Sequence, residues 1–199
     1  IYFIICSPVG AYFNQDLSPI AIYVEDKDVR AAKGGVGFAK TGGNYAASFK
    51  ASKCASKKGF DQVLWLDSVE REYVEEVGAM NMMFVIGNSL HTPSLEGSIL
   101  PGITRDSILE IARQMGINAQ ERRISITEIM EAAESGELSE AFCTGTAAVV
   151  APVGMLEYKG RRYEIGKGKV GPISRKFYDT ITGIQQGLIL DKHGWVTRI

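Results

Sequence analysis

The stretch Lys40-Thr41-Gly42-Gly43-Asn44-Tyr45 leads into a run, residues 45–58, that is predicted to be helical. Two consecutive glycines let a backbone or a flat ring approach closely. A lysine held there, with its amine partly withdrawn from water, loses some of its proton affinity, and only a neutral amine attacks a carbonyl carbon. The stretch therefore suggests a lysine that bonds to a carbonyl compound. Because lysines beside two glycines are also common in solvated loops, the stretch alone does not decide.

Length and composition indicate one soluble globular domain, or one domain and a fragment. The chain has 199 residues, 45% of them hydrophobic, which is enough for a sizeable core. Its net charge of -1 argues against nucleic acid as a main partner. No apolar run is long enough to predict a membrane span.

The cysteines and histidines predict no metal site. Cys6, Cys54 and Cys143 are widely spaced, no CxxC pair occurs, and His91 and His193 are the only histidines. This usage favours a reducing compartment, and we expect the cytoplasm. The chain begins without methionine at Ile1, inside a strand-like run, which we interpret as a truncation point rather than a natural start.

Hydrophobic patterns predict an α+β order of elements. We expect strands at residues 1–6, 19–24, 62–66, 73–77, 82–86 and 119–124, a strand pair at 141–153 broken by Gly145, and a hairpin at 154–163. We expect helices at residues 45–58, 105–115, 128–135 and 174–186. Asn44 is predicted to cap the first helix and Gly59 to end it, and Ser125 begins a predicted capping box. The inner face of the first helix is predicted to consist of Ala46, Ala47, Phe49, Cys54 and Ala55.

Three further stretches add to the evidence from the stretch at residues 40–45. They are Glu75-Glu76-Val77-Gly78-Ala79-Met80-Asn81, Leu100-Pro101-Gly102-Ile103-Thr104-Arg105 and Thr144-Gly145-Thr146-Ala147-Ala148, with Pro8-Val9-Gly10-Ala11-Tyr12-Phe13 and Gln62-Val63-Leu64-Trp65-Leu66 in their expected places. In this order, over about residues 1–195, the chain resembles the branched-chain amino acid aminotransferases, pyridoxal 5'-phosphate (PLP) enzymes of fold type IV. The resemblance implies mixed sheets in a pseudo-barrel with surrounding helices. It also implies that residues 1–199 are the large PLP-binding domain, with the family's small N-terminal domain absent.

The resemblance assigns three residues to the ring of PLP. Lys40 matches the lysine that forms the Schiff base and then carries the proton between the substrate Cα and the cofactor. Tyr45 matches the tyrosine that bonds the ring phenolate. Glu76 matches the carboxylate that faces the ring nitrogen. Glu75 is a rival by residue type, but neighbouring strand residues face opposite ways, so only one of the two can enter the site.

Other residues are assigned to the phosphate and the substrate. The phosphate is expected at the amides of Ile103 and Thr104, where a helix N-terminus favours anions, and at the hydroxyl of Thr146. The amides of the turn at Thr146 and Ala147 are expected to bind the substrate carboxylate. Met80 either lines the side-chain pocket or belongs to the core.

The resemblance implies transfer of the amino group of L-leucine, L-isoleucine or L-valine to 2-oxoglutarate. Full-length family members are usually homodimers acting on small molecules. Two departures stand out: Ala148 and Ala151 occupy the positions of a CxxC redox pair in mammalian relatives, and the family's N-terminal phosphate-binding arginine is missing. D-amino acid aminotransferase or aminodeoxychorismate lyase of the same fold, or a catalytically silent fragment, are the alternatives.

Overall fold

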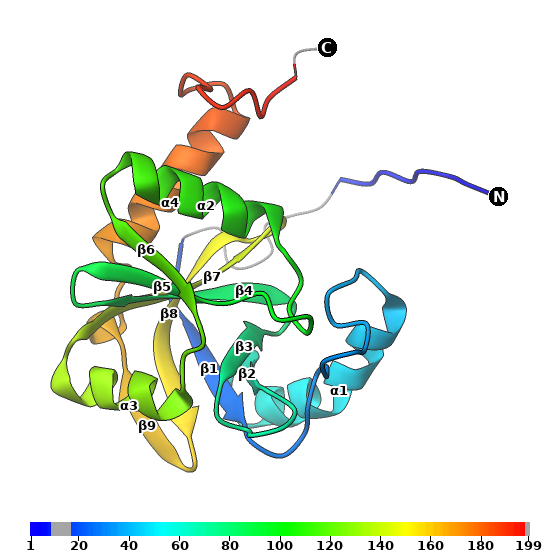
Figure 1. Ribbon diagram of the computed structural model, residues 1–199, viewed down its shortest axis with the longest axis vertical. Helices are drawn as coiled ribbons and strands as arrows, with labels where there is room; N and C mark the ends of the chain where they lie inside the picture. Colours follow the sequence, from blue (N-terminus) through cyan, green and yellow to red (C-terminus); the bar gives the residue numbers. More distant parts are fainter. Residues whose placement is uncertain (9–16, 198–199) are drawn as a thin grey trace.

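The computed structural model describes residues 1–8 and 17–197, and its elements are shown in Figure 1. The strands are β1 (Ile20–Glu25), β2 (Gln62–Leu66), β3 (Val74–Val77), β4 (Met80–Ile86), β5 (Ser89–Pro93), β6 (Asn118–Arg122), β7 (Leu138–Gly145), β8 (Val149–Tyr158) and β9 (Arg161–Glu164). The helices are α1 (Gly42–Lys57), α2 (Ile103–Gln114), α3 (Ile126–Ser135) and α4 (Pro172–Gln185), with a short 3-10 turn, η1, at Gly166–Gly168.

The strands form one mixed sheet that closes on itself. Its order is β3-β2-β1-β8-β7-β4-β5-β6, β9 pairs with β8, and β3 also pairs with β4. The last pairing turns six of these strands into a ring, with β5 and β6 extending it on one side. Pairings β1–β2, β1–β8 and β5–β6 are parallel and the others antiparallel. The predicted α+β pseudo-barrel is therefore confirmed.

Side chains pack in three clusters around this sheet. The largest fills the ring and reaches α3, with Ile22, Leu64 and Phe84 almost fully buried. A second cluster joins the sheet to α2 and α4. The third lies beneath α1 and includes Trp65. Within the described ranges, none of the helices combines the length and apolar character required to span a bilayer.

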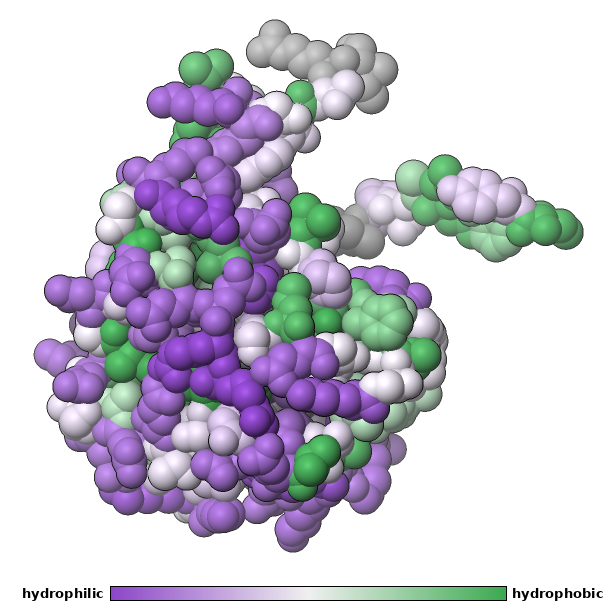
Figure 2. Space-filling view, viewed as in Figure 1, coloured by the Kyte–Doolittle hydropathy of each residue, from purple (hydrophilic) through white to green (hydrophobic). Residues whose placement is uncertain are grey.

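Helix α1 differs from its predicted form. Its buried residues are Ala51 and Ala55, so of the predicted inner face only Ala55 is correct, and Phe49 is 70% exposed. The helix begins at Gly42, so Thr41 and not Asn44 is the N-cap residue, and the Asn44 amide instead donates to carbonyls of the preceding loop. Apolar surface gathers over this loop and α1, as Figure 2 shows.

The predicted strand at residues 1–6 is wrong. Residues 1–8 have no regular structure, and Ile1, Tyr2 and Phe3 are strongly exposed. A strand needs a neighbour for its backbone hydrogen bonds, and this segment projects away from the body of the protein (Figures 1 and 2).

The strand predicted at residues 62–66 is confirmed with the same ends as β2, the other remaining elements are confirmed with shifted ends, and β5 was not predicted. Helices α2 and α4 each begin two residues before their predicted start. The capping box is half formed: the Ser125 hydroxyl accepts the Glu128 amide at 3.0 Å, while the Glu128 carboxylate pairs with Arg122. Strand β5 forms a hairpin with β4 across Gly87 and Asn88 and also pairs with the distant β6. The two-residue turn is a hairpin signal that the sequence analysis did not use.

A single carboxylate organises the turn between β2 and β3. Asp67 accepts the backbone amides of Val69, Glu70, Glu72 and Tyr73 at 2.7 to 3.0 Å. Although partial burial opposes ionisation, these four bonds lower the pKa of Asp67 to about 2.

We expect Asp67→Asn to lower the melting temperature at neutral pH by roughly 2–8 °C. The free energy of unfolding should fall by about 1–2 kcal/mol, after discounting for solvent screening. Because the folded-state pKa of Asp67 lies below its ordinary value, its stabilisation is present above about pH 4 and disappears as the pH falls through 2. Calorimetry from pH 2 to pH 7 should show the variant and the wild type converging in acid. Asp28→Asn, which removes an exposed pair with Lys50, is the control and should change little.

Candidate active site

Four segments far apart in sequence meet at one end of the ring: the loop before α1, the β3–β4 turn, the start of α2 and the β7–β8 turn. They line a cleft of about 460 Å³. The sequence-predicted residues that line it are Lys40, Tyr45, Met80, Ile103, Thr104, Thr146 and Ala147. Glu76 lines a smaller recess that shares Lys40, Tyr45 and Leu100 with the cleft. The structure thus brings all the predicted site residues to one place.

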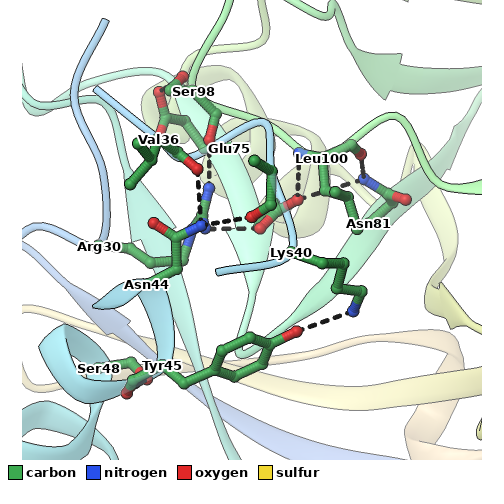
Figure 3. Close-up of polar contacts among 12 residues, drawn as sticks. Arg30, Val36, Lys40, Asn44, Tyr45, Ser48, Glu75, Asn81, Ser98 and Leu100 are labelled. Carbon is green, nitrogen blue, oxygen red and sulfur yellow. Dashed lines mark hydrogen bonds and ion pairs between the residues drawn. The ribbon is translucent and has the colours of Figure 1, made fainter. Parts of the chain in front are cut away.

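Lys40 and Tyr45 form a contact at the mouth of the cleft. The Lys40 Nζ donates to the Tyr45 hydroxyl at 2.9 Å, as Figure 3 shows. Asn44 fixes the loop that carries the lysine by donating to the carbonyls of Val36 and Ala39, both at 2.7 Å. Lys40 itself is exposed, so the expectation of an amine partly withdrawn from water is wrong for this chain by itself.

Glu76 is the buried carboxyl group of the site. It is 2% exposed, and its Oε2 lies 3.1 Å from Arg30 Nε in an ion pair whose N–H is not aligned for a hydrogen bond. Its Oε1 accepts the Leu100 amide at 2.9 Å and the Asn81 Nδ2 at 3.4 Å. Burial raises the pKa of Glu76 to about 7, although Arg30 and the Leu100 amide both favour the ionised form. A cationic ligand in the recess would lower the pKa of Glu76 and so favour its ionised form further.

Glu75 has a different environment, as expected for the next residue of a strand. It accepts the Ser98 hydroxyl at 2.5 Å, and it lines a separate cavity of about 270 Å³ around Asp67. It lines neither the cleft nor the recess beside Lys40. Of the two neighbouring carboxylates, Glu76 is therefore the one placed to meet a ligand in the cleft.

The start of α2 presents unpaired backbone amides to the cleft. Gly102 is the N-cap residue and no side chain caps the helix, so the first amides have no partner within it. Ile103 and Thr104 are the first two helical residues, and the Ile103 side chain is 81% exposed. This arrangement suits an anion such as a phosphate.

The β7–β8 turn closes the opposite side of the cleft. Met80 is buried against this turn. Its side chain lies so close to Gly145 that a Cβ added to this glycine would be 3.4 Å from the Met80 Cγ. Thr144, which the sequence reasoning did not select, lines the cleft with a buried hydroxyl that has no hydrogen-bond partner. A buried orphan hydroxyl points to a bound group that completes it. No local pattern marks Thr144, because a threonine inside an apolar strand is ordinary.

A larger cavity lies elsewhere. A space of about 750 Å³ between the α2 and α3 ends and the start of α4 contains none of Lys40, Glu76 or Thr144. Among the described residues, no three His, Cys, Asp or Glu side chains gather as metal ligands would. We place the active site in the cleft because a lysine amine, a buried carboxylate and free helix amides converge there. These groups suit a ligand that carries a carbonyl, a cationic ring and an anionic group.

Comparison with known proteins agrees with this geometry. Residues 9–155 match the family described as amino-transferase class IV. The chain belongs to the class IV aminotransferases. Among relatives of this class, a probable branched-chain-amino-acid aminotransferase of Staphylococcus aureus (strain N315) is 55% identical over 193 residues, which are 96% of this chain and 54% of that protein. The chain thus spans about half the length of the curated relatives it matches.

Solved structures of class IV aminotransferases share the fold. The branched-chain amino acid aminotransferase of Escherichia coli superposes with a TM-score of 0.83 at 30% identity, over 96% of this chain and 60% of that chain. The T.th. branched-chain amino acid aminotransferase with pyridoxamine 5'-phosphate gives a TM-score of 0.79 at 30% identity, over 93% and 58%. The same enzyme complexed with N-(5'-phosphopyridoxyl)-L-glutamate gives 0.77 at 31% identity, over 89% and 56%.

Proposed function

We propose that this chain is the large, PLP-binding domain (residues 1–199) of a branched-chain amino acid aminotransferase. The observation that carries the proposal is the convergence of Lys40, Glu76 and the α2 amides on one cleft. The names of its relatives support the branched-chain class, and the two T.th. structures support a pyridoxal phosphate cofactor.

The residues of the cleft fit PLP in type and placement. Glu76, ionised, would pair with the protonated ring nitrogen, and the Tyr45 hydroxyl would bond the ring oxygen. The amides of Ile103 and Thr104 and the hydroxyl of Thr146 would hold the phosphate. The orphan hydroxyl of Thr144 supports a bound polar group on the same side. When bound, PLP supplies the electron sink for the substrate's Cα electrons.

Lys40 has two tasks in this proposal. Its amine would hold the cofactor covalently, and the freed amine would be the group that moves a proton at the substrate Cα. The Tyr45 hydroxyl, 2.9 Å from Nζ, orients the amine for both tasks.

The proposed substrates are L-leucine, L-isoleucine and L-valine, with 2-oxoglutarate as amino acceptor. Amides of the turn at Thr146 and Ala147 would bind the α-carboxylate, and Met80 would contact the aliphatic side chain. The L-glutamate adduct of the T.th. enzyme supports the acceptor, because glutamate is the aminated form of 2-oxoglutarate. We further propose a homodimer for the full-length protein and a cytoplasmic location, which free thiols at Cys6, Cys54 and Cys143 support.

A panel of L- and D-amino acids with 2-oxoglutarate tests the substrate class. We expect turnover of L-leucine, L-isoleucine and L-valine. Strong turnover of D-alanine with none of L-leucine would indicate a D-amino acid aminotransferase instead, and formation of pyruvate from aminodeoxychorismate would indicate a lyase. If the chain binds PLP at Lys40 and turns over none of these, the catalytically silent fragment is supported, and joining the chain to the N-terminal domain of a relative should then restore turnover.

Thr144→Val tests whether the orphan hydroxyl meets the cofactor. We expect the affinity for PLP to fall about three- to tenfold, because a bound group loses one hydrogen bond. The stability of the cofactor-free chain should not fall, because the hydroxyl has no partner to lose. Fluorescence titration with PLP and a thermal melt measure the two effects.

Thr92→Val is the matched control. Its buried hydroxyl donates to the Met82 carbonyl at 2.8 Å, away from the cleft, so the variant should lose stability and keep its affinity for PLP. Equal PLP affinity for wild type and Thr144→Val would contradict the assignment.

A further inference from the structure

The segment that joins β5 to α2 is tied to the buried carboxylate of the site. We call residues 98–102 the strap. The Leu100 amide donates to Glu76 Oε1 at 2.9 Å, and the Leu100 carbonyl accepts the Asn81 Nδ2 at 2.9 Å. Figure 3 shows Leu100 and Asn81 joined in this way. Both partners come from β3 and β4, so the strap is fixed to the seam that closes the ring.

Two more bonds hold the start of the strap. The Ser98 hydroxyl donates to Glu75, and the Ser98 carbonyl accepts the guanidinium of Arg30. Arg30 therefore contacts both the strap and Glu76. The backbone of the strap is thus bonded at its first residue, Ser98, and at its middle residue, Leu100, and every partner is a buried side chain.

Asn81 reaches the strap at a second point, beside α2. Its Oδ1 lies against Gly102, where a Cβ would overlap it, and Gly102 is the N-cap residue whose carbonyl accepts the Asp106 amide at 3.0 Å. The Nδ2 of the same side chain also faces Glu76 Oε1 at 3.4 Å. The side-chain amide of Asn81 thus contacts both the Glu76 carboxylate and Gly102, the N-cap residue of α2.

We propose that Asn81 is a positioning residue that, through the strap, couples the Glu76 carboxylate to anion binding at the first amides of α2. The proposal rests on the proposed function, because it takes these as the two ends of one cofactor site. When the carboxylate holds the Leu100 amide, Gly102 and α2 are held in the position seen here. An anion that binds more tightly when α2 is in this position therefore also favours the ionised form of Glu76. By linkage, ionisation of Glu76 strengthens binding of the anion by the same factor.

The direction in which Glu76 changes the anion affinity of α2 distinguishes coupling through the strap from direct electrostatic repulsion. Two negative charges repel through space, so removing the charge of Glu76 should strengthen anion binding at α2 if nothing connects them. Coupling through the strap gives the opposite result, because a neutral side chain holds the Leu100 amide less strongly. The other charges facing Glu76 are Arg30, Lys40 and Glu75, and all stay in place in the test.

The experiment uses the cofactor-free chain with inorganic phosphate as the probe. Amide NMR shifts of Ile103 and Thr104 report phosphate affinity, and the ¹³C resonance of the Glu76 carboxyl, assigned with Glu76→Gln, reports its titration. We expect phosphate to bind about two- to fivefold more weakly to Glu76→Gln, and to lower the midpoint of the Glu76 titration in the wild type. Asn81→Ala should weaken phosphate binding about three- to tenfold and abolish its effect on Glu76.

Asn118→Ala is the matched control. The Asn118 amide donates to Ser89 at 3.0 Å, and neither residue lines the cleft or the recess, so the variant should leave both readouts unchanged. If Asn81→Ala does not fold, Gly102→Ala displaces the Asn81 amide without removing it and should give the same two effects. Stronger phosphate binding to Glu76→Gln, or an unchanged phosphate effect on Glu76 in both the Asn81 and Gly102 variants, would overturn the proposal. Failure of the proposed function looks different: PLP would form no covalent adduct at Lys40, whatever phosphate does.

Discussion

Lys40→Ala should abolish covalent attachment of PLP and lower transamination by at least about 10³-fold. The variant loses the only amine that the structure places beside Tyr45 in the described part of the cleft. Borohydride reduction followed by mass spectrometry should find the cofactor on the peptide containing Lys40 in the wild type and nowhere in the variant. Absorbance above 400 nm should disappear with it.

Lys33→Ala is the control for this result. Lys33 lies in the same loop but pairs with Glu96 at 2.5 Å on the surface, so its loss should leave the adduct and the turnover intact. An adduct that persists in Lys40→Ala at wild-type yield would refute the assignment of the active site. An adduct without turnover in the wild type would keep the site and support the silent fragment.

Glu76→Gln should reduce turnover by about 10²- to 10³-fold, a typical cost of removing one preorganised charge from a reacting centre. It should also change the spectrum of bound PLP, because the proposed function pairs the Glu76 carboxylate with the ring nitrogen. Glu75→Gln is the matched control, since the same chemical change one residue away affects the Ser98 contact and not the recess. Equal losses in the two variants would contradict the role given to Glu76.

The pH dependence follows from the raised pKa of Glu76. In the cofactor-free chain, burial raises the pKa of Glu76 to about 7, so below that pH the carboxyl is largely protonated. We expect PLP affinity to rise as the pH increases through 7 and Glu76 ionises, and Glu76→Gln should remove this rise. Titration of PLP binding by fluorescence between pH 5.5 and 8.5 measures the effect, and a rise that persists in the variant would assign it to another group.

The sequence predicts most of the elements and the grouping of the site, for reasons that particular residues illustrate. Alternating and helical patterns locate β2 and α2, and the glycines at 78 and 145 mark the turns that carry the cleft. The sequence does not predict contacts between residues that are far apart in it. No pattern of neighbouring residues indicates that Arg30 forms an ion pair with Glu76 or that the Asn81 side chain lies against Gly102. Nor does any such pattern indicate that the Thr144 hydroxyl has no hydrogen-bond partner. The buried face of α1 also differs from the prediction, because the sequence of the helix does not indicate which of its faces the rest of the chain covers.

Closure of the ring has a consequence for dividing the chain. Strand β1 is held between β2 and β8, and its pairing with β8 joins Ile20 to Val153, which lies far away in the sequence. A version that stops before β8 would leave one edge of β1 unpaired and open the core around Ile22 and Leu64 to water. Such unpaired, apolar edges join other molecules. Shortened forms ending between residues 100 and 148 should therefore aggregate, and complementation by two separately expressed pieces should succeed only if the second piece supplies both β7 and β8.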